Sequence, residues 1–290
     1  MSVAFRIIPK LDIKGPNLVK GINLEGLRVL GKPEDYAKFY YEQGADELIY
    51  QDVVASLYGR NSLVDIVSRT AKEIFIPLTV GGGIKDIDDI SIILKAGADK
   101  VSINTGAVNN PKFISKAVSR FGSSTIVVAI EAIFQDNGEY LAFTDNGRNS
   151  TDKNVVDWAI EVEKLGAGEI LITSVNKEGT GEGFDRKLIS EILDNVSIPV
   201  VAHGGAGKMD HVLSLKKELD LSGVAISSLF HYDFINLNRK LEGYEDEGNT
   251  TFLSSFRKFK KVEAVSIVEL KRFLSENSIL LRTINWINLR

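Results

Sequence analysis

Two stretches of this sequence follow one pattern: Ile76-Pro77-Leu78-Thr79-Val80-Gly81-Gly82-Gly83 and Ile198-Pro199-Val200-Val201-Ala202-His203-Gly204-Gly205. In each, a short run rich in strand-forming residues ends in glycines. Upstream, Ala45-Asp46-Glu47-Leu48-Ile49 is matched by Ala167-Gly168-Glu169-Ile170-Leu171 at the same interval. That interval is too long for a solenoid repeat and indicates a duplicated half of a large domain. Glycines at a strand end let backbone N–H groups approach a phosphate, so two such ends predict a substrate with two phosphates.

Short apolar runs alternate with amphipathic stretches along the whole chain. The strands are expected at residues 5–11, 46–53, 75–80, 99–103, 124–130, 168–174, 198–202 and 223–228. The helices between them are expected at residues 33–43, 61–73, 86–96, 111–120, 152–165, 186–195 and 209–218. Eight such strands predict a parallel α/β fold closed into a (β/α)8, or TIM, barrel made of two homologous half-barrels. A doubly wound open sheet is the alternative, but its phosphate fingerprint normally follows the first strand.

Two segments exceed a minimal barrel. Residues 133–148 are typical of a hairpin that turns near Asn137-Gly138. Residues 233–264 form an insertion after the eighth strand, and a final helix is expected at about 265–276. The basic run at 257–261 is interpreted as a solvated face rather than a binding patch. We expect a single domain spanning residues 1–290.

Composition excludes several function classes. The 290-residue chain has a net charge of −4, which argues against a general nucleic-acid surface. It contains no cysteine, so disulfides, thiolate metal sites and cysteine nucleophiles are excluded. No signal peptide or membrane-length apolar run is found, and we expect a cytoplasmic protein with no metal and no cofactor.

The active site of such a barrel lies at the carboxyl ends of its strands. The candidates there are Asp12, Asp52, Gly81, Gly82, Gly83, Asn104, Glu131, Thr173, Gly204, Gly205, Ser227 and Ser228. Asp12 and Glu131 end the first and fifth strands and should face each other across the mouth, an arrangement that suits paired acid and base catalysis. The structural alternative for either is a helix cap or a loop salt bridge.

The opposite end of the barrel also carries charge. Arg6, Glu47, Lys100 and Glu169 stand at the starts of four strands. Side-chain alternation points Arg6 inward, on the same face as Asp12. We expect a ring of four charges at the barrel floor, either a stabilising feature or a gate over a passage.

These residues carry a resemblance to a known family. The chain resembles the cyclase subunit of imidazole glycerol phosphate synthase over roughly residues 4–232 and in the last helix. The matching stretches include Arg6-Ile7-Ile8-Pro9, Leu18-Val19-Lys20-Gly21, Val80-Gly81-Gly82-Gly83-Ile84 and Gly204-Gly205-Ala206-Gly207-Lys208. The resemblance implies a barrel that docks a glutaminase subunit on its N-terminal face and receives ammonia through its centre. That family converts a bis-phosphorylated ribulosyl formimino-aminoimidazole carboxamide nucleotide into imidazole glycerol phosphate and the aminoimidazole nucleotide.

The resemblance also implies roles for individual residues. Asp12 matches one catalytic aspartate, and Glu131 stands in the place of the second. Lys20 matches the mobile lysine of the family's first loop. The ammonia gate matches Arg6, Glu47, Lys100 and Glu169. The phosphate-site positions match Gly83, Asn104, Thr105, Gly179, Gly205, Ser227 and Ser228.

Five inner positions depart from the family's pattern. Glu131 is one methylene longer than aspartate, and Lys10, Gln51, His203 and Glu178 replace other residues. Lys10 faces inward and is predicted to pair with Asp12, Glu131 or both. Three hypotheses remain open: the histidine-pathway cyclase, a paralogue that uses ammonia to amidate a sugar or nucleotide-sugar for surface glycans, and a non-catalytic scaffold that activates a glutaminase.

Overall fold

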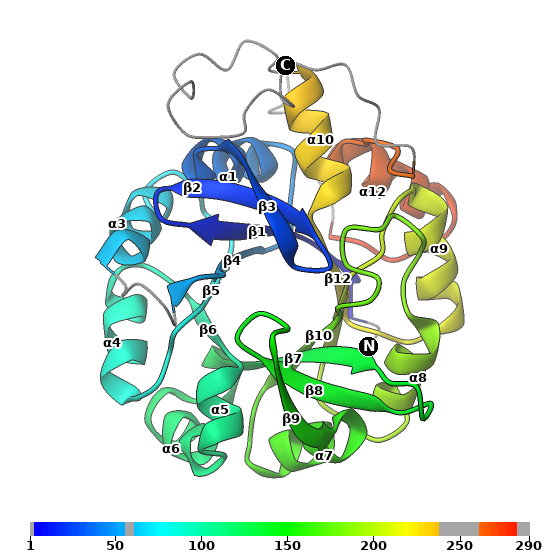
Figure 1. Cartoon of the computed structure of the whole chain (residues 1–290). Coiled ribbons are helices and arrows are strands. Elements are labelled where there is room, and N and C mark those ends of the chain that lie inside the picture. Colours follow the sequence, from blue (N-terminus) through cyan, green and yellow to red (C-terminus); the bar gives the residue numbers. More distant parts are fainter. Residues whose placement is uncertain (1–2, 56–60, 238–260, 283–290) are drawn as a thin grey trace.

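The computed structural model describes residues 3–55, 61–237 and 261–282, and these form a closed parallel barrel (Figure 1). Its eight strands pair in the order β1, β4, β5, β6, β7, β10, β11, β12 and back to β1. Their bounds are β1 Arg6–Lys14, β4 Leu48–Asp52, β5 Leu78–Gly81, β6 Lys100–Ile103, β7 Ile126–Phe134, β10 Glu169–Ser174, β11 Val200–His203 and β12 Gly223–Ile226. Pairing of Arg6 with Gly223 closes the ring, so the open-sheet alternative is wrong and the (β/α)8 barrel is confirmed.

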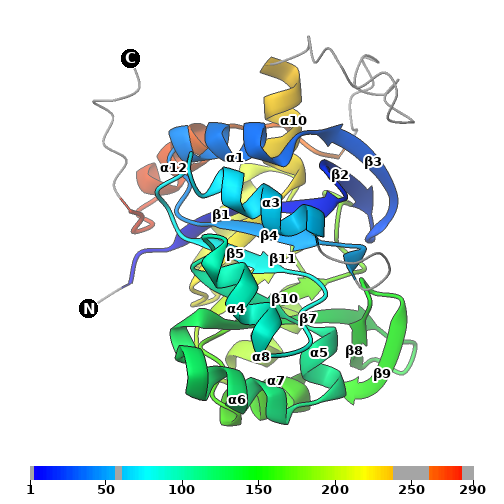
Figure 2. The same cartoon turned by 90° about the vertical axis from the view of Figure 1, so that its left-hand side faces the viewer.

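Helices surround the strands on the outside (Figures 1 and 2). Those that follow the predicted pattern are α1 Pro33–Glu42, α3 Asn61–Thr70, α4 Ile87–Lys95, α6 Lys112–Phe121, α7 Val155–Lys164, α8 Arg186–Leu193, α9 Met209–Glu218 and α12 Ile267–Glu276. Three helical elements were not expected: α5 Thr105–Asn109, the 3-10 turn η1 Ser123–Thr125, and α10 Ser228–Leu237. Residues 233–237 of the predicted insertion are therefore helical, and residues 238–260, with the basic run, lie outside the described residues.

Two antiparallel hairpins extend from the barrel at one end (Figure 2). The first, β2 Asn17–Ile22 and β3 Glu25–Gly31, pairs with the end of β1 and was not predicted. The second combines the end of β7 with β8 Tyr140–Thr144 and β9 Asn149–Asn154. It was predicted within residues 133–148, with a turn near Gly138, where φ is +87°. Because Asn154 caps the next helix through its side chain, that helix begins at Val155 rather than at residue 152.

Two apolar layers hold the barrel together. The large outer layer lies between the strands and the helices and includes fully buried Trp158, Tyr36 and Tyr40. The inner layer lies inside the barrel and consists of Ile8, Ile49, Val127, Ala129, Leu171, Val201 and Ala225. Since side chains alternate along a strand, each inner residue identifies which of its neighbours also point inward.

The last described helix is tied to the start of the barrel. Ser266 and Glu269 form a capping box at the beginning of α12, which typically contributes about 1 kcal/mol. The buried Lys271 on this helix donates to Asp46 Oδ1 at 2.7 Å and to the carbonyl of Gly44 at 2.7 Å. Asp46 also accepts the backbone N–H of Ile7 at 2.8 Å. The helix, β1 and the turn before β4 thus share one buried ion pair.

Candidate active site at the barrel mouth

The inward face of β1 carries charged residues at both ends of the barrel. Ile8 belongs to the inner apolar layer, so Arg6 lies below it and Lys10 and Asp12 lie above it on the same face. The strand register aligns Lys10 with Ile49, and Asp12 with Gln51 of β4. The mouth therefore contains a lysine, an aspartate and a glutamine where the sequence predicted them.

Lys10 and Asp12 form an ion pair inside the mouth. Both residues are buried, and the Lys10 ammonium donates to Asp12 Oδ1. Burial by itself would raise the pKa of Asp12, but the ammonium groups of Lys10 and Lys20 lower that pKa below its ordinary value. Asp12 is thus ionised near neutral pH. The predicted pairing of Lys10 is confirmed for Asp12.

Glu131 behaves differently. It lies on β7, and its Oε2 accepts the backbone N–H of Gly147 at 2.7 Å. Burial raises the pKa of Glu131 to about 7, although the Gly147 hydrogen bond and the Lys10 charge act in the opposite direction. The Lys10 charge thus acts on both carboxyls, but at Glu131 burial outweighs it. A carboxyl group with this pKa can release and accept a proton near neutral pH.

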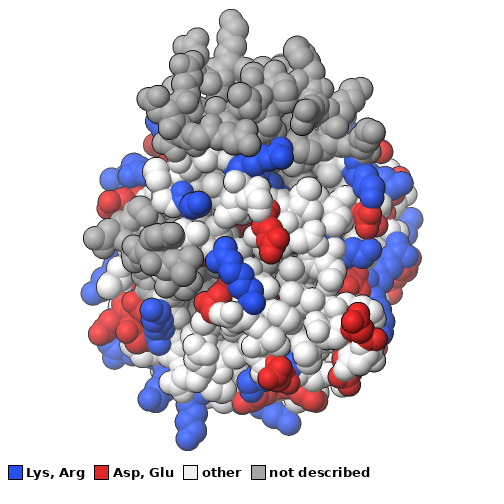
Figure 3. Space-filling model, viewed as in Figure 1, with Lys and Arg blue, Asp and Glu red and all other residues white. Residues whose placement is uncertain are grey.

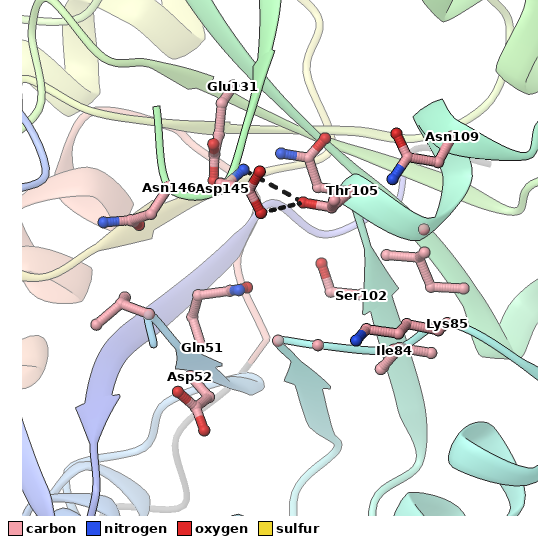
Figure 4. A pocket seen from close by; sticks show the side chains of 16 residues that line it. Gln51, Asp52, Ile84, Lys85, Ser102, Thr105, Asn109, Glu131, Asp145 and Asn146 are labelled. Carbon is pink, nitrogen blue, oxygen red and sulfur yellow. Dashed lines mark hydrogen bonds between the residues drawn. The ribbon is translucent and has the colours of Figure 1, made fainter. Parts of the chain in front are cut away.

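A cavity of about 120 Å³ opens at the ends of β4 to β7, in the first half-barrel and beside Glu131. Six predicted site residues line it, namely Asp52, Gly82, Gly83, Asn104, Thr105 and Glu131. Figure 4 shows the side chains of Gln51, Thr105 and Glu131 around one space. The cavity thus brings the first group of predicted phosphate-site residues together with one candidate catalytic carboxyl.

The β8–β9 turn supplies cavity residues that the sequence did not single out. Asp145 and Asn146 line the cavity, and the backbone N–H of Asp145 donates to Thr105 Oγ1 at 3.2 Å (Figure 4). Both residues have positive φ, +53° and +61°. The Asp145-Asn146-Gly147 triplet is a turn signal. It identifies a turn, but only the fold shows that this turn reaches the cavity.

Equivalent glycines at the two repeated strand ends are required by close backbone contact. Gly82 has φ +114°, and a Cβ there would lie 2.6 Å from the carbonyl oxygen of Asp52. Gly204 has φ +102°, and a Cβ there would lie 2.7 Å from the carbonyl oxygen of Ser174. Each loop therefore packs on the end of the preceding strand in a conformation that only glycine adopts freely.

The second group of predicted phosphate-site residues lies at the ends of β10, β11 and β12. Gly179 and Gly205 occupy the loops after β10 and β11, Ser227 follows β12, and Ser228 begins α10. The Ser227 hydroxyl donates to the carbonyl of Lys10 at 2.7 Å. The structure thus places this group on the other side of the mouth from the cavity.

Lys20 lies in the β2–β3 hairpin, which covers this second side. Its ammonium pairs with the buried Glu178 and donates to the carbonyl of Gly21 at 2.6 Å. The backbone N–H of Leu24 donates to Glu178 Oε2 at 3.1 Å. A Cβ on Gly179 would lie 3.2 Å from Lys20 Nζ, so Lys20 stands beside a predicted phosphate loop. Glu178 is the anchor of the hairpin over the end of β10.

At the other end of the barrel, the expected ring of charges is present. Arg6 contacts Glu47 and Glu169, each at 2.7 Å. Lys100 contacts Glu47 at 3.0 Å and Glu169 at 3.8 Å. Each cation thus bridges both anions, and we call these four side chains the floor ring; Glu47 is buried, and the other three are partly exposed. Ion pairing explains the geometry of the floor ring without assigning it a function.

The described residues contain neither a candidate metal cluster nor a candidate membrane span. Within residues 3–55, 61–237 and 261–282, no three His, Asp or Glu side chains are grouped so as to hold a metal ion. In the same ranges no helix is long and apolar enough to cross a membrane. On the mouth face, Figure 3 shows Lys and Arg side chains interspersed with Asp and Glu side chains among the described residues.

Together, the closed barrel and the carboxyl groups at its mouth define a (β/α)8-barrel enzyme. The model of the family described as "Histidine biosynthesis protein" matches residues 6–236, and the chain belongs to this family. Its relatives include three proteins named imidazole glycerol phosphate synthase subunit HisF. The one from Legionella pneumophila is 58% identical over 205 residues, covering 71% of this chain and 97% of the relative. The one from Methanopyrus kandleri is 45% identical over 266 residues, covering 86% and 98%. The one from an Exiguobacterium species is 48% identical over 226 residues, covering 78% and 88%.

Proposed function

We propose that this chain is the cyclase subunit of imidazole glycerol phosphate synthase. With ammonia, it converts the bis-phosphorylated ribulosyl formimino-aminoimidazole carboxamide nucleotide into imidazole glycerol phosphate and the aminoimidazole nucleotide. The observation that carries the proposal is the cavity in which Glu131 stands beside Gly83, Asn104 and Thr105. It combines a proton-transfer group with a loop suited to a phosphate. The similarity to HisF proteins supports the same reaction.

The two half-barrels divide the binding of the substrate. One phosphate binds at Gly83, Asn104 and Thr105, and the other binds at Gly179, Gly205, Ser227 and Ser228. Lys20 lies beside Gly179, which supports a role for its charge near the second phosphate. A substrate that spans the mouth between these sites passes Asp12 and Glu131. Glu131 transfers protons, and ionised Asp12 stabilises positive charge that develops on the substrate.

Ammonia enters at the floor. A glutaminase of the HisH type docks on the N-terminal face, and the floor ring of Arg6, Glu47, Lys100 and Glu169 admits its product to the barrel. A groove lined by Ile74, Phe75, Ile76, Pro77 and Asp99 supports this docking face, because it lies next to Lys100 in the sequence and presents a Phe75 side chain that is 82% exposed. Exposed aromatic side chains beside a groove are frequent anchors of protein interfaces.

A second candidate is favoured by the Lys10–Asp12 pair. A carboxylate that is held ionised is a poor general acid, so the chemistry at Asp12 differs from that of an unpaired carboxyl. In this alternative, the chain uses ammonia to amidate a sugar or nucleotide-sugar for surface glycans. The glutaminase and the floor ring keep the same roles.

One set of assays separates the candidates. The purified chain is incubated with the bis-phosphorylated nucleotide and ammonium, and formation of imidazole glycerol phosphate is followed. Turnover abolished by Glu131→Gln supports the cyclase. If turnover is weak and Glu131→Asp raises it, the chain is a cyclase limited by the longer side chain. Absence of turnover in both the wild-type chain and Glu131→Asp, together with ammonia-dependent amidation of a sugar substrate, would establish the alternative.

The partner and the location need separate tests. Binding of a HisH-type glutaminase is measured by calorimetry, and stimulation of glutamine hydrolysis reports whether docking is productive. The cytoplasmic location expected from the sequence stays a prediction, and cell fractionation tests it.

A further inference from the structure

His203 lies inside the barrel, and the residues aligned with it on neighbouring strands define its height along the barrel axis. It ends β11 and points inward, because Val201, two residues before it, belongs to the inner apolar layer. The strand register aligns His203 with Thr173 of β10, and Thr173 with Glu131 of β7. Along β10, the inward residues are Glu169 of the floor ring, then Leu171 of the apolar layer, then Thr173. His203 is therefore the first polar group above the apolar layer on this side, in the register row of Glu131.

The hydrogen bonding of His203 determines which of its nitrogens carries the proton. Nδ1 lies 2.9 Å from the carbonyl oxygen of Ala225, which only accepts, so Nδ1–H is the donor. In the neutral ring, Nε2 then carries the lone pair. Nε2 is buried and has no hydrogen-bond partner within the described parts of the chain. Burial, followed by the Lys10 charge, lowers the pKa of His203 to about 4, so the ring is neutral at physiological pH.

A buried acceptor without a partner restricts the ligand it can take. Leaving Nε2 unsatisfied costs free energy, so a ligand that donates a hydrogen bond to it is favoured. A phosphate oxygen does not fit, because it is itself an acceptor. A cation does not fit either, because the Lys10 ammonium lies close enough to influence the pKa of His203. The remaining class is a small neutral molecule with N–H or O–H donors.

We propose that Nε2 of His203 binds ammonia inside the barrel, where it leaves the apolar layer and before it reaches the substrate. This inference rests on the proposed ammonia passage and adds a binding residue to it. The acceptor holds neutral ammonia through one of its N–H groups, while Lys10 disfavours ammonium. No bond is made or broken at His203. The substrate phosphates bind elsewhere, at the glycine loops.

Nuclear magnetic resonance of the wild-type chain tests binding without requiring turnover. The chain has three histidines, His203, His211 and His231, so side-chain 15N labelling gives a simple spectrum. Ammonium chloride is added at a pH where part of it is neutral ammonia, and potassium chloride serves as the salt control. We expect the Nε2 signal of His203 to shift with ammonium chloride alone. His231 is the matched control: it is also buried and its Nε2 also has no hydrogen-bond partner among the described residues, but it lies on α10, where its Nδ1 bonds to Tyr40 of α1.

Two variants test the role in turnover. His203→Asn keeps a side-chain N–H near the position of Nδ1 but removes the acceptor. His203→Gln places an amide near the position of Nε2 and can restore an acceptor there. With ammonium as the nitrogen source, His203→Asn should raise the KM for ammonia by up to about tenfold, the loss of one hydrogen bond. The KM for the phosphorylated substrate should not change, and His203→Gln should recover part of the effect.

The outcomes separate this inference from the proposed function. An ammonia-specific shift of His203 supports the inference even if the chain makes no imidazole glycerol phosphate. Cyclase turnover with no shift, and with an unchanged KM for ammonia in His203→Asn, would overturn the inference and leave the proposed function standing. A rise in the KM for the phosphorylated substrate alone would also overturn it, because His203 would then contact the substrate.

Discussion

The floor and the mouth of this barrel both carry charged side chains on the inward face, but the interaction partners of those charges differ between the two ends. In the floor ring, each cation touches two anions, so the four charges neutralise one another. At the mouth, Lys10 is paired with Asp12, whereas Glu131 accepts hydrogen bonds from the backbone N–H of Gly147 and the side chain of Asn104, and burial still raises its pKa to about 7. A buried carboxyl with a pKa near 7 exchanges protons readily at neutral pH, and this identifies the mouth as the place of the chemistry.

The largest effect is expected at the mouth, from Asp12→Asn. Turnover with ammonium should fall by about 10²–10⁴-fold if Asp12 acts directly on the substrate. The variant also leaves the buried Lys10 without its carboxylate, which should destabilise the fold by roughly 3–5 kcal/mol. Steady-state kinetics and chemical unfolding measure the two effects.

The double variant Lys10→Met/Asp12→Asn is the control for Asp12→Asn. It removes both charges, so the fold should recover while turnover stays low. Near-normal turnover in either variant would mean that Asp12 is only a structural partner of Lys10.

The second prediction concerns pH and Glu131. Because its pKa rises from 4.5 to about 7 in the folded chain, the native state binds this proton more tightly than the unfolded state. The free energy of unfolding should therefore fall as pH rises from about 4.5 to 7. Glu131→Gln lacks this dependence. The stability difference between wild type and variant should change by about 3 kcal/mol across that range. Urea unfolding at several pH values measures it, and parallel curves would show that Glu131 is not perturbed.

The floor provides the third test. Lys100→Met removes one cation of the ring and should lower glutamine-dependent turnover by roughly tenfold more than ammonium-dependent turnover, as expected for a passage whose lining is changed. Both rates are measured in the complex with the glutaminase. A folded variant in which the two rates fall equally would reduce the floor ring to a stabilising feature.

The smallest effect is expected beside the floor ring. Phe75→Ser removes an exposed aromatic side chain, so the fold should change little. Affinity for the glutaminase should fall by roughly 1–2 kcal/mol if Phe75 anchors the partner. Exposed Ile92, which is on α4, supplies the matched control Ile92→Ser. Equal effects of the two variants on calorimetric binding would argue against a specific docking groove.

The barrel, its duplicated halves and the floor ring could all be predicted from the amino-acid sequence. Alternation along a strand dictates which side chains share a face, so Arg6, Lys10 and Asp12 could be placed inside without coordinates. The repeated glycine-ended strands located both sides of the mouth, because glycine is needed where backbones approach closely. The final helix was expected at about residues 265–276, and the structure has it at Ile267–Glu276.

The interaction partners of those charged and polar groups, in contrast, depend on the three-dimensional fold. The β2–β3 hairpin joins Lys20 to Glu178, residues far apart in the chain, and no local pattern specifies that contact. The sequence identifies Asp145 and Asn146 only as turn residues, and it is the fold that places them at the cavity. Lys10 was predicted to pair with Asp12, Glu131 or both; its charge outweighs burial in setting the pKa of Asp12, whereas burial prevails at Glu131. The cost of burying a charge depends on everything around it in three dimensions, which one-dimensional spacing does not contain.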